Sequence, residues 1–150
     1  MNRLNRKVEY ALMALKMISD QPAGQLTSAQ EVVDRLSIPF DATARVLQVL
    51  AQYRVLKSEH GAQGGYRLQR DLNHLSLYEL MEMVLGPVAV AKCMQEGEGC
   101  DLKKTCNIAS PIAEFNHQME LFYRNLNVGQ LFLARGLNRK DATVASGARA

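Results

Sequence analysis

The sequence predicts a mainly α fold with a small β-hairpin and a long C-terminal helix. Apolar residues recur at helical spacing in three short segments within residues 7–54, and two strand-like runs then flank a glycine-rich turn in residues 55–68. A chain of 150 residues can bury one modest core. No apolar run approaches the about 18 residues that span a bilayer, and no signal peptide is evident. We therefore expect a cytoplasmic protein without membrane contact.

The first two helices are predicted over residues 7–20 and 28–37. The first ends in the turn-forming run from Asp20 to Gly24. Thr27 is the predicted N-cap of the second helix, and Gln30, three residues later, completes a capping box.

The third helix is predicted to begin at Asp41, as its N-cap, and to end near Arg54. Its expected inner face consists of apolar residues, namely Ala42, Val46, Val49, Leu50 and Tyr53. Its expected outer face consists of polar residues, namely Thr43, Arg45, Gln48 and Gln52. Two helices joined by a short turn, the second with a polar outer stripe, indicate a helix–turn–helix.

The segment after the third helix predicts a β-hairpin and then a fourth helix. Residues 55–59 and 65–68 have strand character, and the glycine-rich run 60–64 is the hairpin tip. Ser76 is the predicted cap of the fourth helix, with Glu79 closing a capping box. Residues 1–87 are thus predicted to form a winged helix–turn–helix DNA-binding region.

All three cysteines lie close together in residues 88–107, which we expect to be a ligand-bearing loop. Six residues separate Cys93 from Cys100 and five separate Cys100 from Cys106. Zinc sites use closer pairs, whereas an iron–sulfur cluster, 2Fe–2S or 4Fe–4S, tolerates this wider spacing. Three thiolates leave a fourth position open, for which a carboxylate or His117 of the seam helix could serve. His60, on the predicted hairpin, and His74, in a turn before a helix cap, are poor candidates. The alternative without a ligand is that the three cysteines are unrelated residues of the core.

Residues 108–135 are predicted to form a dimerisation helix, starting at Ser110-Pro111, with a short return segment. Five apolar residues recur with alternating steps of three and four, namely Ile112, Phe115, Met119, Phe122 and Leu126. This is the seam by which a helix packs on a partner helix, so we expect a homodimer. The polar, alanine-rich residues 136–150 are predicted to be a disordered tail.

Basic residues are concentrated where a DNA-binding surface is expected. Residues 1–70 hold ten Lys or Arg against six Asp or Glu, whereas residues 71–107 hold three against six. Thr43, Arg45 and Gln48 are expected in the major groove, where Arg reads guanine and Gln reads adenine. The remaining expected contacts, in the minor groove or to phosphates, come from the hairpin and the N-terminus: Lys57, His60, Gln63, Arg67, Arg3, Arg6 and Lys7. Any of these side chains could instead be merely solvated.

The sequence resembles the winged-helix iron–sulfur regulators of the IscR and NsrR type over about residues 1–135. The resemblance rests on Tyr10-Ala-Leu12, on Gly64-Gly-Tyr-Arg-Leu68 leading to Leu75-Ser-Leu77, and on the cysteines after the fourth helix. It implies a homodimer that binds a pseudo-palindromic double-stranded operator and holds a cluster between the cysteine loop and the partner's first helix. The IscR-type fourth ligand is a histidine, but Ala109 stands at that position. The NsrR type uses an acidic residue of the first helix, which corresponds to Glu9 of the partner subunit.

We therefore expect a non-enzymatic transcription regulator, a repressor, whose DNA affinity follows iron–sulfur status, iron, nitric oxide or redox state. One alternative is a cluster-free regulator that senses redox state by forming disulfides. Another is an iron–sulfur carrier or scaffold that does not bind DNA. No nucleophile–base pair, phosphate loop or metal-hydrolase motif favours an enzyme.

Overall fold

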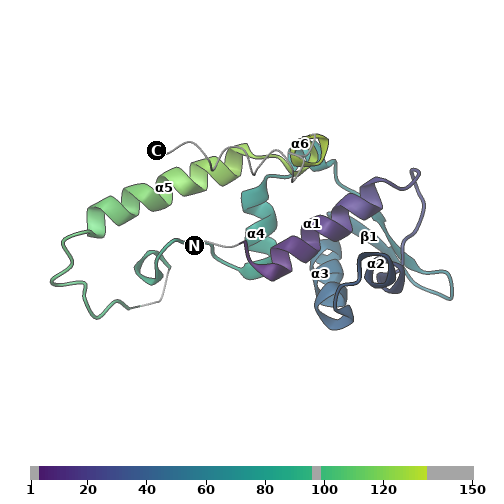
Figure 1. Ribbon diagram of the computed structural model, residues 1–150, viewed down its shortest axis with the longest axis horizontal. Helices are drawn as coiled ribbons and strands as arrows, with labels where there is room; N and C mark the ends of the chain where they lie inside the picture. Colours follow the sequence, from purple (N-terminus) through teal and green to yellow (C-terminus); the bar gives the residue numbers. More distant parts are fainter. Residues whose placement is uncertain (1–3, 96–98, 135–150) are drawn as a thin grey trace, which may run out of the picture.

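The computed structural model describes residues 4–95 and 99–134 (Figure 1). The Arg3 contact and the tail 136–150 predicted above lie outside these residues. The elements, in chain order, are α1 (Arg6–Ser19), α2 (Ala29–Leu36), α3 (Phe40–Gln52), β1 (Leu56–Glu59), β2 (Gly65–Leu68), the 3₁₀ turn η1 (Leu72–His74), α4 (Leu77–Leu85), the 3₁₀ turn η2 (Lys92–Met94), α5 (Ala109–Asn125) and α6 (Val128–Leu133). The mainly α fold with a small hairpin is confirmed.

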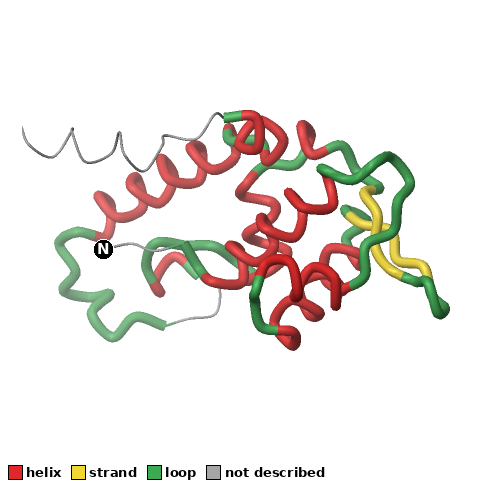
Figure 2. The backbone as a smooth tube through the Cα atoms, turned by 45° about the vertical axis from the view of Figure 1, so that its right-hand side comes forward, coloured by secondary structure: helices red, strands yellow, loops and turns green. Residues whose placement is uncertain are grey.

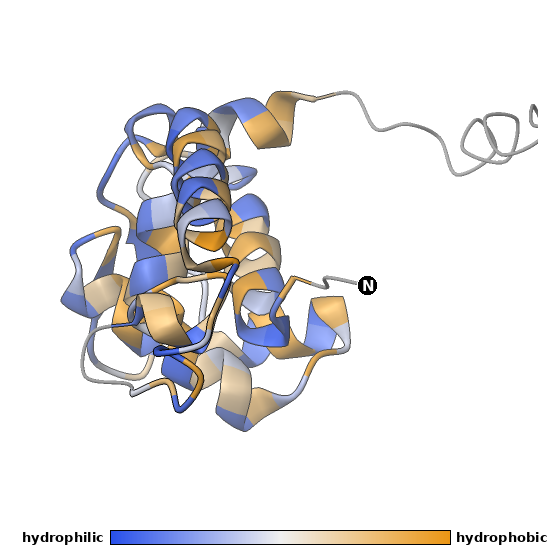
Figure 3. Cartoon of the chain, turned by 90° about the vertical axis from the view of Figure 1, so that its left-hand side faces the viewer, coloured by the Kyte–Doolittle hydropathy of each residue, from blue (hydrophilic) through white to orange (hydrophobic). Residues whose placement is uncertain are grey.

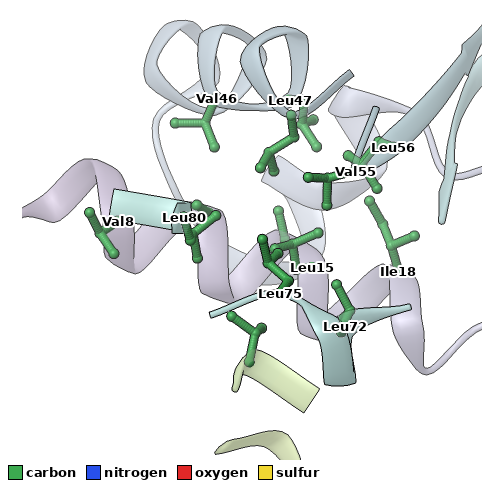
Figure 4. Packing of buried hydrophobic residues seen from close by; sticks show 14 of the residues in the cluster. Val8, Leu15, Ile18, Val46, Leu47, Val55, Leu56, Leu72, Leu75 and Leu80 are labelled. Atoms are coloured by element: carbon green, nitrogen blue, oxygen red, sulfur yellow. The ribbon is translucent and has the colours of Figure 1, made fainter. Parts of the chain in front are cut away.

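The core lies where α1 crosses α3 and α4. Val8, Leu15 and Ile18 of α1 meet Leu47 of α3 and Leu80 of α4, and all five are buried (Figure 4). Burying a leucine or isoleucine side chain stabilises the fold by about 1.5–3 kcal/mol each. These contacts unite residues far apart in the chain, so the helices fix one another's orientation. Within the described ranges, no helix is long and apolar enough to cross a membrane.

The start of α2 lies one residue later than predicted. Ser28 is the N-cap and forms a reciprocal capping box with Glu31, so the prediction of Thr27 and Gln30 is wrong. The reason is tertiary, because the Thr27 backbone N–H and C=O both pair with Tyr66 of the hairpin at 2.9 Å. Thr27 thus serves the hairpin as an additional β-bridge and leaves the cap to its neighbour.

The buried face of α3 is rotated relative to the prediction. The helix begins at Phe40 after Pro39, so the prediction of Asp41 as its N-cap is wrong. Its buried residues are Thr43, Val46, Leu47 and Leu50, whereas Tyr53 is 55% exposed. The Thr43 hydroxyl donates a hydrogen bond to the Pro39 carbonyl at 2.7 Å, which satisfies the buried polar group. The expectation that Thr43 belongs to the exposed face is therefore wrong.

The hairpin, hereafter the wing, is antiparallel with Leu56 opposite Leu68 and Glu59 opposite Gly65. It projects from the helical body formed by α1–α4, at the end away from α5 (Figure 2). A Cβ at Gly65 would lie only 2.8 Å from the Thr27 backbone, so this position needs glycine for the two segments to approach. The predicted strands are confirmed, although Val55 precedes β1 and is buried in the core.

The cap of α4 is confirmed in detail. Ser76 and Glu79 form a complete capping box, and Arg70 adds an ion pair to the Glu79 carboxylate at 3.0 Å. Burial alone would raise the pKa of Glu79, but hydrogen bonds from Ser76 and Arg70 outweigh burial and lower it. This cluster joins the end of the wing to the start of α4.

The C-terminal part leaves the body and then returns to it. In Figure 1, α5 extends away from the body, with residues 99–108 at its outer end. The chain after α5 comes back because the Leu77 N–H donates to the Leu126 carbonyl and the Val128 N–H donates to that of Leu75. The helix starts at Ala109, a residue earlier than the predicted Ser110-Pro111, and the predicted return segment is α6.

Candidate nucleic-acid interface and cysteine segment

The exposed face of α3 carries Arg45 and Gln48, three residues apart and both exposed. A three-residue step on a helix places two side chains on one face, so both can reach the same groove. The start of the helix adds two residues that sequence reasoning missed, Phe40 and Asp41, both exposed. Phe40 was missed because a cap at Asp41 would have left it outside the helix. The signal that could have found it is Pro39, since proline commonly sits at a helix start.

The wing presents a second polar surface. Lys57, His60 and Gln63 are exposed, and Lys57 lies directly opposite Arg67 in the strand register. Residues opposite each other point to one side of a hairpin, so two cations share this side. Arg67 is half-buried and forms an ion pair with Glu59 at 3.0 Å, which fixes its guanidinium beside the strands.

Lys7 and Glu9 lie at the other end of the body. Lys7 lines a cavity of about 600 Å³ together with residues of α4, α5 and the segment after α4, among them Leu85 and Asn116. In Figure 1 this end of α1 is far from the wing. The structure therefore does not bring Lys7 together with the wing residues. The Glu9 carboxylate forms an ion pair with the Arg6 guanidinium of the same helix, at 2.6 Å, and the Glu9 side chain is 34% exposed.

The cysteine segment, residues 88–107, carries three free thiols. Cys93 on η2 is exposed, and Cys100 and Cys106 are half-buried. The segment is attached to α5 by a hydrogen bond from the Val90 N–H to the Asn116 side-chain oxygen at 3.0 Å. A backbone turn from the Lys103 N–H to the Cys100 carbonyl at 3.1 Å shapes its second half.

The donor set of this segment suits a thiolate-bound iron–sulfur cluster, but its donors are not assembled in the single chain. Free, accessible thiols are the ligands that such clusters use. Yet the described ranges contain no group of three or more His, Cys, Asp or Glu side chains that could hold a metal ion. The segment would have to close around a cluster to bind it.

Within the described residues, the seam of α5 is only partly covered: Leu126 packs against the core and Met119 lines the cavity described above. Phe115 and Phe122 are 50% and 57% exposed, and the other seam residues, Ile112, Met119 and Leu126, are half-buried. Figure 3 shows apolar and polar residues around the axis of this helix. None of its residues is buried.

One cluster holds α5 against α4. The Arg124 guanidinium lies 4.0 Å from the centre of the Tyr78 ring and pairs with Glu120 at 2.7 Å. Burial and the nearby carboxylates of Glu82 and Glu120 raise the pKa of Tyr78. The tyrosine therefore remains neutral beneath the arginine.

Three helices followed by a wing, with arginine and glutamine on the exposed face of the third helix, define the class of winged helix–turn–helix regulators. Residues 4–133 match the Rrf2 family, described as iron-dependent transcriptional regulators. The match covers most of the chain, and the protein belongs to the Rrf2 family of transcriptional regulators. The resemblance seen in the sequence is thereby confirmed.

Individual relatives and structures agree with this membership. The chain is 28% identical to an rrf2-like HTH-type transcriptional regulator of Rhodobacter capsulatus, over 74% of this chain and 79% of that protein. It is 22% identical to the HTH-type transcriptional regulator NsrR of Shouchella clausii, over 75% of this chain and 76% of that protein. The fold matches CymR, the global cysteine regulator of B. subtilis, with a TM-score of 0.68 at 16% identity, covering 91% of this chain and 100% of that one.

Proposed function

We propose that this protein is a repressor that binds a pseudo-palindromic operator as a homodimer and senses its signal through an iron–sulfur cluster on Cys93, Cys100 and Cys106. One observation carries the proposal. The three free thiols lie on the segment that joins α4, which is packed into the helix–turn–helix, to α5, which exposes Phe115 and Phe122. A ligand that closes this segment would act on both parts at once.

DNA binding would use α3 and the wing. Arg45 and Gln48 suit direct contacts to guanine and adenine in the major groove. Lys57, His60 and Gln63 would contact phosphates or the minor groove, and Arg67 stands beside them on the same side of the wing as Lys57. Because phosphate contacts release counterions, the affinity should fall steeply as salt concentration rises.

Dimerisation would use α5. Two half-exposed phenylalanines on one helix are costly to leave in water, and a second copy of the same helix offers a matching apolar seam. A two-fold symmetric dimer presents two α3 helices and therefore requires a palindromic operator.

Sensing would use the cysteine segment together with Glu9 of the partner subunit. When bound, the cluster supplies an iron centre that responds to oxidants and nitric oxide. Residues 88–107 would be restrained when their cysteines hold the cluster. The Val90–Asn116 hydrogen bond would pass this restraint to α5. A carboxylate fourth ligand would require Glu9 to leave Arg6, so the site would be labile.

Visible absorption with iron and sulfide assays on protein purified without oxygen tests the cluster. We expect a brown protein with matching iron and sulfide, and loss of both in Cys93→Ala, Cys100→Ala and Cys106→Ala. Glu9→Ala should speed cluster loss in air, while Glu114→Gln, an exposed carboxylate change on α5, should not. A protein that stays colourless after anaerobic reconstitution contradicts the cluster and favours a disulfide sensor. That sensor would have the same three free thiols and a fold shared with the cysteine regulator CymR.

DNA binding is tested separately by selecting duplexes from a random pool and measuring affinity at several salt concentrations. Arg45→Ala should weaken binding to the selected duplex by at least about fivefold, as expected for loss of one specific base contact worth about 1–3 kcal/mol. Arg35→Ala, an exposed arginine on α2, is the matched control. A brown protein without salt-dependent DNA affinity would instead be an iron–sulfur carrier or scaffold.

A further inference from the structure

The first turn of α3 offers DNA an unusual set of groups. Phe40, its first residue, is 47% exposed. Asp41 is exposed beside it, and the Thr43 hydroxyl is buried and bonded to the Pro39 carbonyl. This turn therefore presents a phenyl ring and a carboxylate, and neither a cation nor an accessible hydroxyl.

These groups do not suit phosphate binding. A carboxylate repels phosphate, and a phenyl ring has no donor to offer it. The N-terminal residues of a recognition helix are the ones that approach base edges. In the major groove, the base-edge group that an apolar side chain can recognise is the thymine methyl.

We propose that Phe40 is a specificity-determining residue that contacts a thymine methyl group in each half of the operator. This inference rests on the proposed DNA-binding function. The ring is free to make the contact because Ala44, its neighbour one turn along the helix, has only a methyl side chain. Arg45 and Gln48 then read neighbouring bases by hydrogen bonding.

The contact also explains why an aromatic residue stands at this position. Phe40 is not among the residues that form or line the hydrophobic core. It does not cap α3, because no side chain forms a capping hydrogen bond at the start of this helix. Packing of the core therefore does not require an aromatic ring here, whereas a buried contact in the complex would use one.

The experiment uses the duplex selected by the wild-type protein. Each symmetric pair of thymines is replaced in turn by deoxyuridine, which keeps every hydrogen bond and lacks only the methyl group. At one pair the affinity should fall about fourfold per half-site, the effect of losing burial of one methyl-sized group. Phe40→Ala and Phe40→Gln should bind the thymine duplex more weakly and should not respond to the replacement at that pair.

The matched control is Tyr53→Ala. Tyr53 is an aromatic residue of similar exposure, 55%, at the other end of α3. This variant should keep the wild-type response to deoxyuridine. Circular dichroism verifies that each variant is folded. The loss of affinity of the wild-type protein for the deoxyuridine duplex tests the contact without any substitution in the protein.

The possible results separate the role of Phe40 from the DNA-binding function. DNA binding in which no thymine pair responds overturns the role of Phe40 and leaves the DNA-binding function intact. The same holds if both Phe40 variants keep the wild-type response. Absence of salt-dependent binding to any duplex in the pool overturns the proposed function, and this inference with it.

Discussion

The helix–turn–helix body and the C-terminal part of this protein are stabilised in different ways. Every buried residue of the described chain lies between Val8 and Met81, with the single exception of Val128. Over the same body, α2 and α4 both start with complete capping boxes. By contrast, α5 has no buried residue, although it is the longest helix described.

This difference indicates which part of the protein is complete within one chain. The body caps α2 and α4 with its own side chains and buries an apolar core between α1, α3 and α4, which fixes α3 and the wing in place. The cysteine segment and α5, by contrast, leave thiols and phenyl rings accessible. The proposed sensing role would use such a division, because a region that changes conformation must be less stable than the region it controls.

The largest effect that distinguishes the two regions is expected from truncating leucines. Leu15→Ala, at a fully buried position of α1, should lower the free energy of unfolding by about 2–5 kcal/mol. Leu102→Ala, in the cysteine segment at 67% exposure, should change it by less than about 0.5 kcal/mol. Urea unfolding followed by circular dichroism measures both. Equal losses would mean that the two regions are not stabilised differently.

A smaller effect is expected from a charge placed on the seam. Phe122→Glu should weaken self-association by at least about 30-fold, the loss typical of an interface hot spot of about 2 kcal/mol. Sedimentation at several concentrations measures it. Ala113→Glu adds the same charge to the opposite face of α5, and its exposed position predicts little change. Unaltered association in Phe122→Glu would remove α5 from the interface.

The smallest effect concerns the cap of α4 and depends on pH. The folded protein lowers the pKa of Glu79, so the charged carboxylate stabilises the fold above its unfolded pKa of about 4.3. Glu79→Gln should therefore reduce stability at neutral pH by about 1 kcal/mol or less, since the pair with Arg70 is a third exposed. The difference from the wild type should shrink as pH falls through the folded pKa. A difference that is constant with pH would show that the charge of Glu79 is not what stabilises the cap.

Local sequence signals predicted most elements because they act over a few residues. The capping box at Ser76, the glycine-tipped wing and the 3–4 spacing along α5 each depend on neighbours in the chain. The cysteines were equally visible, since their spacing is a property of the sequence.

The errors arose where two local solutions were comparable and a distant contact chose between them. Thr27 and Ser28 can both cap a helix, and the pairing of Thr27 with Tyr66 decided for Ser28. Likewise, the periodicity of α3 allowed either Ala42 or Thr43 to face inward. Packing against α1 and α4 decided for Thr43, whose hydroxyl could be satisfied by Pro39.

By itself, then, the sequence determined the order of elements, the winged class of fold and the clustering of the cysteines, because caps, turns and spacing are short-range properties. Only the tertiary structure decided which residues α3 presents to solvent, and so exposed Phe40 in place of Thr43. The physical reason is that a helix has one periodicity but several possible rotations about its axis, and only the surfaces packed against it select one.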